Sequence, residues 1–307
     1  MSDATAVQEQ TSHRFYEHLL DNLYEAVWFI NPQRQITYWN PGAEQLTGYR
    51  RDQIIGKSCC EDLLLHFRED HSGVASGSHP AAETLADGKL RQEDVYLRHR
   101  EGHLVPVHVR VAPIPDEEGN IAGVIEVLTS NCPRGAEVLT TDQLQDVGLV
   151  DPLTGLSNRR YLQMRLQSRY EELTRYNWLF GVILAGIDNY DEASQIQGWE
   201  TCEKLVQMAG KTFANSLRSY DVVGRWSESE FLAIVPILQY SDLYAVGERV
   251  RNLVEKACLM TTDGAMGVTI SIGAAAADPY GSVDDLINRA QLWVNRSRTA
   301  GGNQVTL

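Results

Sequence analysis

The sequence predicts a mixed protein of α-helices and β-strands, built as two domains joined by a short helical segment. Three observations support this. The chain has 307 residues, enough for two domains. Residues 13–130 are dominated by short apolar runs between turns, whereas residues 151–307 alternate apolar runs with long amphipathic helices. Between them, Asn131-Cys132-Pro133-Arg134-Gly135 breaks the last strand-like run of the first half.

The composition narrows the classes of function. The formal net charge of −14 argues against general binding to nucleic acid or to an anionic membrane, because both need a basic surface. Any phosphate ligand must therefore be held by a local arginine cluster. The longest apolar run, residues 178–187, is too short to span a bilayer, and residues 1–12 are polar rather than signal-like. The cysteines show no C-x-x-C spacing, so we expect a cytoplasmic protein; they are Cys59, Cys60, Cys132, Cys202 and Cys258.

The first half is predicted element by element. Residues 1–12 are expected to be disordered, and residues 14–23 carry apolar side chains at helical spacing. The remaining expected elements, in chain order, are strands at 26–30 and 36–39, short helices at 42–46 and 51–55, and strands at 91–99, 103–112 and 121–129. Turns are expected at 100–102 and 115–120, so the half reads as strands, a helical crossover and three further strands.

Three segments of this half resemble the PAS sensor fold. They are Ile36-Thr37-Tyr38-Trp39-Asn40-Pro41-Gly42-Ala43-Glu44-Gln45-Leu46-Thr47-Gly48-Tyr49, then Ile55-Gly56, and Gly119-Asn120-Ile121-Ala122-Gly123. The resemblance implies a PAS domain over residues 13–130, with an antiparallel sheet and a helical crossover. PAS domains bind haem, flavin, small metabolites or one another, so the ligand stays unknown.

Several residues of this half bear on a cofactor. His66, His71 and His79 lie in the expected helical crossover, where a haem ligand would be found, but residues 69–79 are polar enough for a solvated loop, and we predict no haem. Cys59-Cys60 is either a redox pair or two small buried residues. Trp39-Asn40 either contacts a flavin or ends a strand and caps the next helix.

The second half alternates strands and helices. The expected elements are helices at 159–175, 189–196, 199–217, 242–258 and 283–300, strands at 179–187 and 267–276, and a hairpin over 222–236. The half opens with Asp151-Pro152-Leu153-Thr154-Gly155-Leu156-Ser157-Asn158-Arg159-Arg160-Tyr161. Here Pro152 and Gly155 shape a turn, and Asn158 is placed to cap the following helix.

This opening motif, with Ser271-Ile272-Gly273 and Gly301-Gly302-Asn303-Gln304-Val305 near the end, resembles the GGDEF domains of diguanylate cyclases. The resemblance covers residues 151–307. It implies a central mixed sheet flanked by helices, as in nucleotidyl cyclases. It also implies a relation to enzymes that join two GTP molecules into cyclic di-GMP.

The signature hairpin departs from the family pattern. Where the family reads Gly-Gly-Asp/Glu-Glu-Phe, this chain reads Ser227-Glu228-Ser229-Glu230-Phe231. Ser227 and Glu228 add side chains where glycines let the backbone approach the nucleotide. Ser229 cannot hold a divalent cation strongly, so Glu230 is the matching carboxylate that remains in the turn.

The rest of the implied catalytic pocket departs in the same direction. The family pattern Asp-Ile-Asp-x-Phe-Lys reads Gly186-Ile187-Asp188-Asn189-Tyr190-Asp191, so a metal-binding carboxylate is missing and an acid replaces the lysine. The guanine-reading pair becomes Ser194 and Glu203, beside Gly198-Trp199, and the phosphate-binding lysine becomes Arg298, with Gly302 in place of an arginine. We predict no catalytic residue, no metal site and no cofactor in this domain. The vestigial pocket comprises Gly186, Asp188, Asp191, Ser194, Glu203, Ser227, Glu228, Ser229, Glu230 and Arg298.

One constellation matches the family intact. Arg218-Ser219-Tyr220-Asp221 stands at the spacing of the family's inhibitory Arg-x-x-Asp site, which binds the product cyclic di-GMP, and Arg249 stands where a second arginine is often supplied. A guanidinium can pair with phosphate or with the acceptor edge of guanine, and a carboxylate can accept the guanine N1–H and N2–H. The alternative is a helix-terminal salt bridge.

The linker, residues 131–150, is predicted to carry a short helix. Thr140-x-x-Gln143 forms a capping box that opens a helix through Leu144, Val147 and Val150. In PAS–GGDEF proteins such a segment pairs across a homodimer, so we expect a dimer through the PAS domain and this helix. The alternative is a monomeric tether.

Three functions remain open from the sequence. The first is a non-catalytic cyclic di-GMP receptor acting through Arg218, Asp221 and Arg249. The second is a diguanylate cyclase with weak or unorthodox activity. The third is an interaction module that binds a protein partner and no nucleotide.

Overall fold

The computed structural model describes residues 17–59, 66–68, 79–116, 118–130, 148–218, 220–237, 239–261 and 264–307. The chain divides into two compact units, one of residues 1–100 and 106–131 and one of residues 101–105 and 132–307. Each unit is described by itself. Within the described ranges, no helix is both long enough and apolar enough to cross a membrane.

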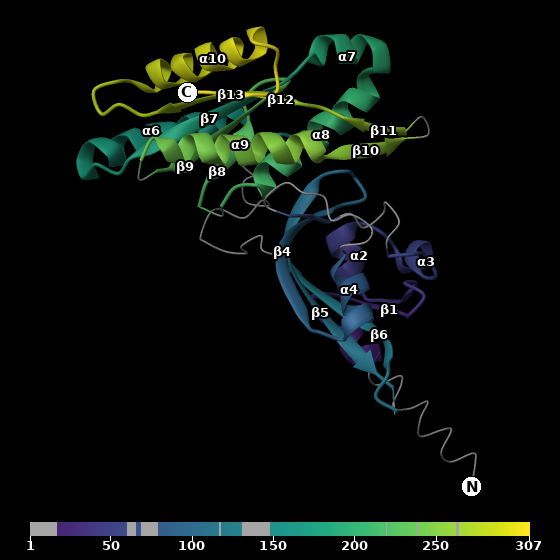
Figure 1. Cartoon of the computed structure of the whole chain (residues 1–307). Coiled ribbons are helices and arrows are strands. Elements are labelled where there is room, and N and C mark those ends of the chain that lie inside the picture. The colour runs from purple at the N-terminus through teal and green to yellow at the C-terminus, as the bar shows by residue number, and fades with distance from the viewer. Residues whose placement is uncertain are drawn as a thin grey trace. The chain divides into compact units, whose positions relative to one another are not determined.

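The first unit is a six-stranded sheet with short helices (Figure 1). The strand order is β2-β1-β6-β5-β4-β3, with β1 antiparallel to β2 and β6, β5 antiparallel to β6, and β3 antiparallel to β4. The strands are β1 (Ala26–Ile30), β2 (Ile36–Trp39), β3 (His66–Arg68), β4 (Arg91–Arg98), β5 (Leu104–Pro115) and β6 (Ile121–Ser130). The helices are α2 (Pro41–Thr47), α3 (Arg51–Ile54) and α4 (Pro80–Asp87), which confirms the expected antiparallel sheet with a helical crossover.

Asn40 shows how the sequence starts a helix here. The side chain is fully buried, and its Oδ1 accepts hydrogen bonds from the Ala43 amide (2.8 Å) and the Val27 amide (2.9 Å). One residue therefore caps α2 and ties it to β1. The capping alternative is the one observed, and the neighbouring Trp39 stacks on Trp28 with ring centroids 4.7 Å apart.

Three predictions for this half need correction. His66 lies in strand β3 rather than in the helical part of the crossover. His79 is buried at the start of α4, which excludes a solvated loop at that position, while His71 lies outside the described residues. Strand β5 continues to Pro115 because Pro113 and Pro115 still pair with β6. At the N-terminus, residues 17–21 of the expected helix are helical, and residues 1–12 lie outside the described ranges.

The predicted linker helix is wrong at its end. Val150 is not helical; it forms an antiparallel bridge with Ser157. Gly148 adopts a left-handed conformation (φ 66°), and Leu149 packs against Tyr161. The left-handed residue turns the chain away from a helical path just before Val150. Residues 131–147 lie outside the described residues.

The second unit is built on a five-stranded mixed sheet with the order β13-β12-β7-β9-β8 (Figure 1). Its strands are β7 (Phe180–Ile187), β8 (Val222–Arg225), β9 (Glu230–Pro236), β12 (Ile270–Ala276) and β13 (Val305–Thr306). The β12–β13 pair is parallel and the other pairs are antiparallel. The helices are α6 (Arg159–Tyr176), α7 (Tyr190–Gln197), α8 (Trp199–Asn215), α9 (Ser241–Lys256) and α10 (Val283–Thr299). This confirms the expected mixed sheet flanked by helices.

Helices cover both faces of this sheet. Leu162 and Leu166 of α6 and Leu286 of α10 pack on one face, and Phe213 of α8 and Val250 of α9 pack on the other. Strand β7 is buried along its whole length because it lies in the middle of the sheet. The polar residues that follow β7 are therefore fixed at one edge of a rigid scaffold.

One small addition to this unit was not predicted. Strands β10 (Cys258–Thr261) and β11 (Gly264–Gly267) form a separate two-stranded sheet, so the strand expected over 267–276 begins only at Ile270. The loop of the β8–β9 hairpin runs from Trp226 to Ser229, and Glu230 is already the first residue of β9. Asn158 caps α6 as predicted, accepting a hydrogen bond from the Tyr161 amide at 3.1 Å.

Candidate functional site

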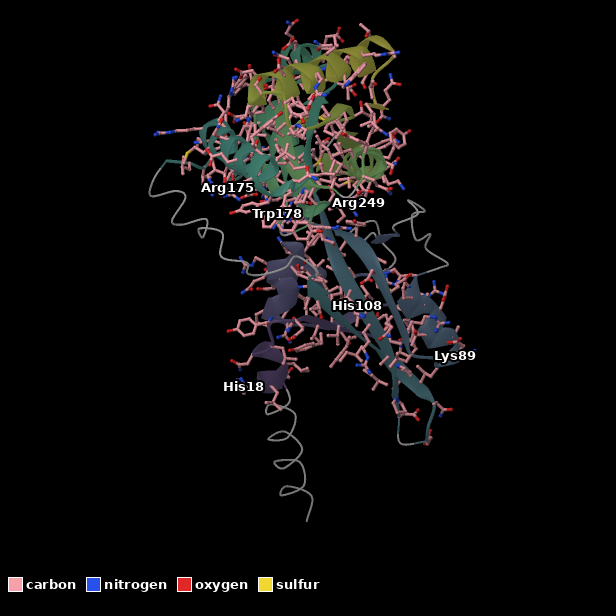
Figure 2. The ribbon with its side chains drawn as sticks, turned by 90° about the vertical axis from the view of Figure 1, so that its left-hand side faces the viewer. His18, Lys89, His108, Arg175, Trp178 and Arg249 are labelled. Atoms are coloured by element: carbon pink, nitrogen blue, oxygen red, sulfur yellow. The ribbon has the colours of Figure 1, made fainter. Side chains whose placement is uncertain are left out.

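The structure gathers the three residues of the predicted Arg-x-x-Asp site around one pocket. The pocket has a volume of about 350 Å³ and lies between the end of α8, strand β9 and helix α9. Figure 2 labels Arg249, which projects from α9. The lining residues are Arg218, Asp221, Val235, Pro236, Asp242, Ala245, Val246 and Arg249.

The loop that carries Arg218 and Asp221 is closed by its own hydrogen bonds. The Arg218 amide donates to Asp221 Oδ2 at 2.8 Å, and the Asp221 amide donates to the Arg218 carbonyl at 3.0 Å. These two bonds fix the relative positions of the two residues before any ligand arrives. A preformed loop of this kind lowers the entropy lost on binding.

Two polar atoms in this pocket are buried without a hydrogen-bond partner among the described residues. They are Asp221 Oδ1 and Arg249 Nε. Burial raises the pKa of Asp221, while the amide of Arg218 and the charges of Arg218, Arg249 and Arg169 oppose that rise. Buried polar groups without partners are costly. A ligand that offers both N–H donors and anionic oxygens would satisfy both atoms.

Asp242 also lines the pocket and was not predicted. Its Oδ2 accepts a hydrogen bond from the Gln239 amide at 3.0 Å, at the start of α9. An acid just after Ser241, at the beginning of an amphipathic helix, is the signal that sequence reasoning passed over. With Asp221, this second carboxylate gives the pocket two acidic side chains beside its two arginines.

The vestigial pocket lies at the opposite end of the hairpin, where Gly186 pairs with Glu230 across β7 and β9. A Cβ on Gly186 would overlap the Arg298 guanidinium. Arg298 Nη1 lies 3.6 Å from Glu230 Oε1, and the same carboxylate accepts hydrogen bonds from Ser227 Oγ (2.9 Å) and Gln291 Nε2 (3.1 Å). A guanidinium therefore occupies the space beside Glu230 that a second carboxylate would need.

The placement of Arg298 changes the expected role of that residue. The sequence resemblance put a phosphate-binding cation at this position. In the structure the side chain is turned toward Gly186 and paired with Glu230. Its charge balances a carboxylate of the protein itself.

Asp188, the other retained acid, is also held by the protein. Oδ2 accepts from Thr269 Oγ1 (2.8 Å) and from the Asn303 amide (3.0 Å), and Oδ1 accepts from Ser271 Oγ (2.6 Å). Both oxygens thus join the end of β7 to β12 and to the C-terminal turn. Asp188 and Glu230 belong to no group of three potential metal ligands within the residues that the structure describes.

The remaining residues of the vestigial pocket make local contacts. Ser194 Oγ donates to the carbonyl of Asp191 (2.8 Å), and Glu203 accepts from Trp199 Nε1 (2.9 Å). Glu228 accepts from Tyr190 Oη at 3.4 Å, and the Ser229 carbonyl accepts the Ile187 amide at 2.9 Å. The acids in the first turn of α7 are Asp191 and Glu192, and they repel an anion from that helix N-terminus.

A second polar cluster lies inside the first unit. Glu126 is fully buried, and its Oε2 accepts a hydrogen bond from Trp28 Nε1 at 2.5 Å. Its Oε1 lies 3.8 Å from Nδ1 of the buried His79 and has no hydrogen-bond partner among the described residues. Burial raises the pKa of Glu126 to about 8 and lowers the pKa of His79 to about 4. Both groups are therefore neutral at pH 7, and no sequence pattern pointed to Glu126.

Residues 148–304 match the family described as diguanylate cyclase, GGDEF domain, and residues 25–130 match the family described as PAS domain. The chain belongs to the GGDEF family. Its architecture is a PAS domain followed by a GGDEF domain, as the sequence resemblance implied.

Individual proteins with similar sequences or folds include diguanylate cyclases. The probable diguanylate cyclase DgcE of Escherichia coli is 22% identical over 311 residues, which cover 99% of this chain and 28% of DgcE. The diguanylate cyclase SiaD of Pseudomonas aeruginosa, solved with its activator SiaC, aligns with a TM-score of 0.51 and 27% identity over 53% of this chain and 63% of SiaD. The GGDEF domain of DgcB from Caulobacter crescentus, solved with c-di-GMP, shares the fold at a TM-score of 0.50 and 22% identity, over 52% of this chain and 94% of that chain.

The chain is shorter than its curated relatives. It spans between 28% and 37% of the length of the first relatives that it matches. The GGDEF domain is the shared part in most of these matches, and it places the chain in a family of cyclic di-GMP signalling domains.

Proposed function

We propose that this PAS–GGDEF chain is a catalytically inactive receptor for cyclic di-GMP. The pocket at Arg218, Asp221 and Arg249 carries the proposal, because it presents an unpartnered buried carboxylate oxygen and an unpartnered guanidinium nitrogen together. Asp221 Oδ1 accepts the N1–H and N2–H groups of a guanine, and the two arginines hold phosphate oxygens or the guanine acceptor edge. With a net charge of −14, only a local arginine cluster can hold such an anion.

The vestigial pocket supports the inactive part of the proposal. Joining two GTP molecules requires divalent cations held by carboxylates beside the triphosphate. In this chain Glu230 is paired with Arg298, Asp188 accepts three hydrogen bonds from the protein itself, and position 186 offers no side chain. One guanidinium thus stands where the cation would be needed.

We also propose an oligomeric state, a location and a partner for this protein. The PAS domain over residues 13–130 and the linker over residues 131–150 pair two chains into a homodimer, and the GGDEF domain takes up residues 151–307. The scattered cysteines support a cytoplasmic location. A protein partner reads the ligand-bound state, in line with SiaD, which was solved with an activator protein.

Isothermal titration of the full chain with cyclic di-GMP tests the receptor. The unmodified protein should bind, and Arg218→Ala should weaken binding at least about thirtyfold, because it leaves a charged group of the ligand without its partner. Asp221→Asn keeps the shape of the side chain but presents an amide donor to the guanine donors, so it should weaken binding by a similar factor. The matched control is Arg296→Ala, an exposed arginine on α10. Absence of binding by the unmodified protein would favour the interaction module.

Incubation with GTP and Mg²⁺ or Mn²⁺ tests the inactive part separately. Chromatography of the products should show no cyclic di-GMP above a protein-free control. Robust formation of the dinucleotide would instead establish the unorthodox cyclase and refute the inactive assignment.

A further inference from the structure

We propose that Tyr220 is a further ligand-binding residue of this pocket, and that its hydroxyl and the Arg218 guanidinium together hold one phosphate of the dinucleotide. This inference rests on the proposed function and deepens it. It adds a residue inside the Arg-x-x-Asp loop, at a position that the motif leaves unspecified.

Arg218 and Tyr220 are in direct contact. Arg218 Nη1 donates a hydrogen bond to Tyr220 Oη at 2.5 Å, and the guanidinium carbon lies 5.8 Å from the centre of the tyrosine ring. This hydrogen bond raises the pKa of Arg218. Tyr220 is 47% exposed, so a ligand bound at the neighbouring Arg218, which lines the pocket, can reach the pair.

The hydrogen-bonding capacity of the pair is only partly used. The phenol oxygen of Tyr220 accepts one hydrogen bond from Arg218, which leaves its own O–H free to donate. Within the described residues, Arg218 makes no other side-chain hydrogen bond, so the remaining N–H groups of its planar fork are also available. A guanidinium N–H and a phenol O–H side by side match two oxygens of one phosphodiester.

Tyr220 lies on the same short loop as Arg218 and Asp221, which line the pocket. The hydrogen bonds between Arg218 and Asp221 close the loop on either side of Tyr220. Exposed arginine–tyrosine contacts are common on protein surfaces and by themselves signify little. This one lies on the loop that also presents the unpartnered Oδ1 of Asp221 to the pocket, which Arg249 of α9 also lines. The acid on that element, Asp242, is already engaged by Gln239.

Titration of cyclic di-GMP into the full-length Tyr220→Phe protein tests the inference. Removing the hydroxyl should weaken binding about tenfold, the effect of losing one hydrogen bond to a charged group, with no change in melting temperature. Tyr220→Ala should weaken binding by the same factor within about twofold, because the hydroxyl makes the contact. The matched control is Tyr280→Phe, which changes a fully exposed tyrosine remote from the loop in sequence and should bind like the unmodified protein.

A double-mutant cycle separates a shared phosphate site from a general role in the loop. Lysine at position 218 keeps the charge but lacks the planar fork that aligns one N–H with Tyr220 and another with the phosphate, so Tyr220→Phe should cost less than about threefold in an Arg218→Lys background. Equal losses in both backgrounds, or a lowered melting temperature for Tyr220→Phe, would overturn the shared site.

The outcomes for the two proposals are distinct. If the unmodified protein binds and Tyr220→Phe binds equally well, the Tyr220 inference fails and the receptor stands. If Tyr220→Ala loses affinity while Tyr220→Phe keeps it, the ring rather than the hydroxyl makes the contact and the inference also fails. If the unmodified protein binds no cyclic di-GMP, both proposals fall together.

Discussion

Glu126 and His79 face each other in the PAS core, and burial favours the neutral form of both. Glu126 accepts a hydrogen bond from Trp28 at one carboxyl oxygen. The other oxygen has no hydrogen bond among the described residues. A carboxyl that stays protonated at pH 7 avoids placing an unpaired charge in the core. The ionisation of Glu126 at alkaline pH therefore opposes folding.

The pH dependence of stability follows from this. Glu126 keeps its proton in the folded state up to a pKa of about 8, whereas an unfolded chain releases it near its ordinary value of 4.5. The stabilisation from the neutral form is thus complete below about pH 4.5 and is lost as the pH rises through 8, with a slope of at most about 1.4 kcal/mol per pH unit. Urea denaturation followed by tryptophan fluorescence should show this slope between pH 6.5 and pH 8 in the unmodified protein and not in Glu126→Gln. At lower pH the lowered pKa of His79 gives a slope of opposite sign, which both proteins share. Parallel profiles for the two proteins would contradict the assignment.

Arg298 and Gly186 permit a second prediction at the scale of single residues. Gly186→Asp alone should push the Arg298 guanidinium out of the overlap with the new Cβ and then pair with it, so that Mn²⁺ does not raise the melting temperature. Gly186→Asp combined with Arg298→Met leaves two carboxylates, at positions 186 and 230, without that cation, and Mn²⁺ should then stabilise the protein. Thermal unfolding with and without Mn²⁺ measures both, with the unmodified protein as control. A metal response in the single variant would show that Arg298 moves aside freely.

At the scale of elements, Asp188 is a joint between three segments. Its side chain connects the end of β7 to Thr269 and Ser271 at β12 and to the turn before β13. The short strand β13 pairs with β12 over only two residues, so it depends on this joint more than on its own ladder. An acid that resembles a metal ligand in sequence is thereby a structural residue in this chain.

Removing that joint should destabilise the GGDEF unit. Asp188→Ala leaves the two hydroxyls and the Asn303 amide without their acceptor, which should cost about 2–4 kcal/mol of unfolding free energy. Asp191→Ala, a change at a nearby exposed acid, should cost less than about 0.5 kcal/mol. Urea denaturation of both variants measures the difference, and equal stabilities would refute the role of Asp188 as a joint.

The elements that the sequence predicted well are those with strong local signals. Strands β1 and β2 match the predicted bounds, and the caps at Asn40 and Asn158 are where the sequence placed them. The missed hairpin of β10 and β11 has no such signal, because its second strand is Gly-Ala-Met-Gly and lacks β-branched residues. Two-residue strands such as β13 are set by tertiary pairing rather than by propensity.

The candidate site was predictable only in part. Spacing relative to a known family was enough to select Arg218, Asp221 and Arg249, and the structure places all three around one pocket. The directions of long side chains were not predictable. Arg298 was expected to face a phosphate and instead faces the half-buried Glu230, because a long flexible side chain can turn toward a carboxylate that is distant in the sequence.

At the scale of the whole molecule, each of the two compact units has its own sheet. The proposed cyclic di-GMP site lies in the GGDEF unit. A ligand stabilises the unit that binds it by mass action. The two units should therefore differ in their thermal response to cyclic di-GMP.

Scanning calorimetry of the full chain tests this. With free cyclic di-GMP at 100 times its dissociation constant, the GGDEF transition should gain about 2.7 kcal/mol, and the PAS transition should stay in place. Arg218→Ala should show neither shift under the same conditions. A ligand-induced shift of the PAS transition alone would show that cyclic di-GMP binds the PAS unit, and it would contradict the proposed site in the GGDEF unit.

The overlap between position 186 and Arg298 also sets a rule for sequence change. A chain of this fold that acquires an acid at position 186 must first turn the arginine of position 298 away or exchange it, and a chain that loses the arginine leaves Glu230 facing a gap. The two positions should consequently vary as a pair among homologous chains, with glycine accompanying the inward arginine and aspartate accompanying a shorter or outward cation. An alignment in which the two positions vary independently would show that the space beside Glu230 tolerates both side chains.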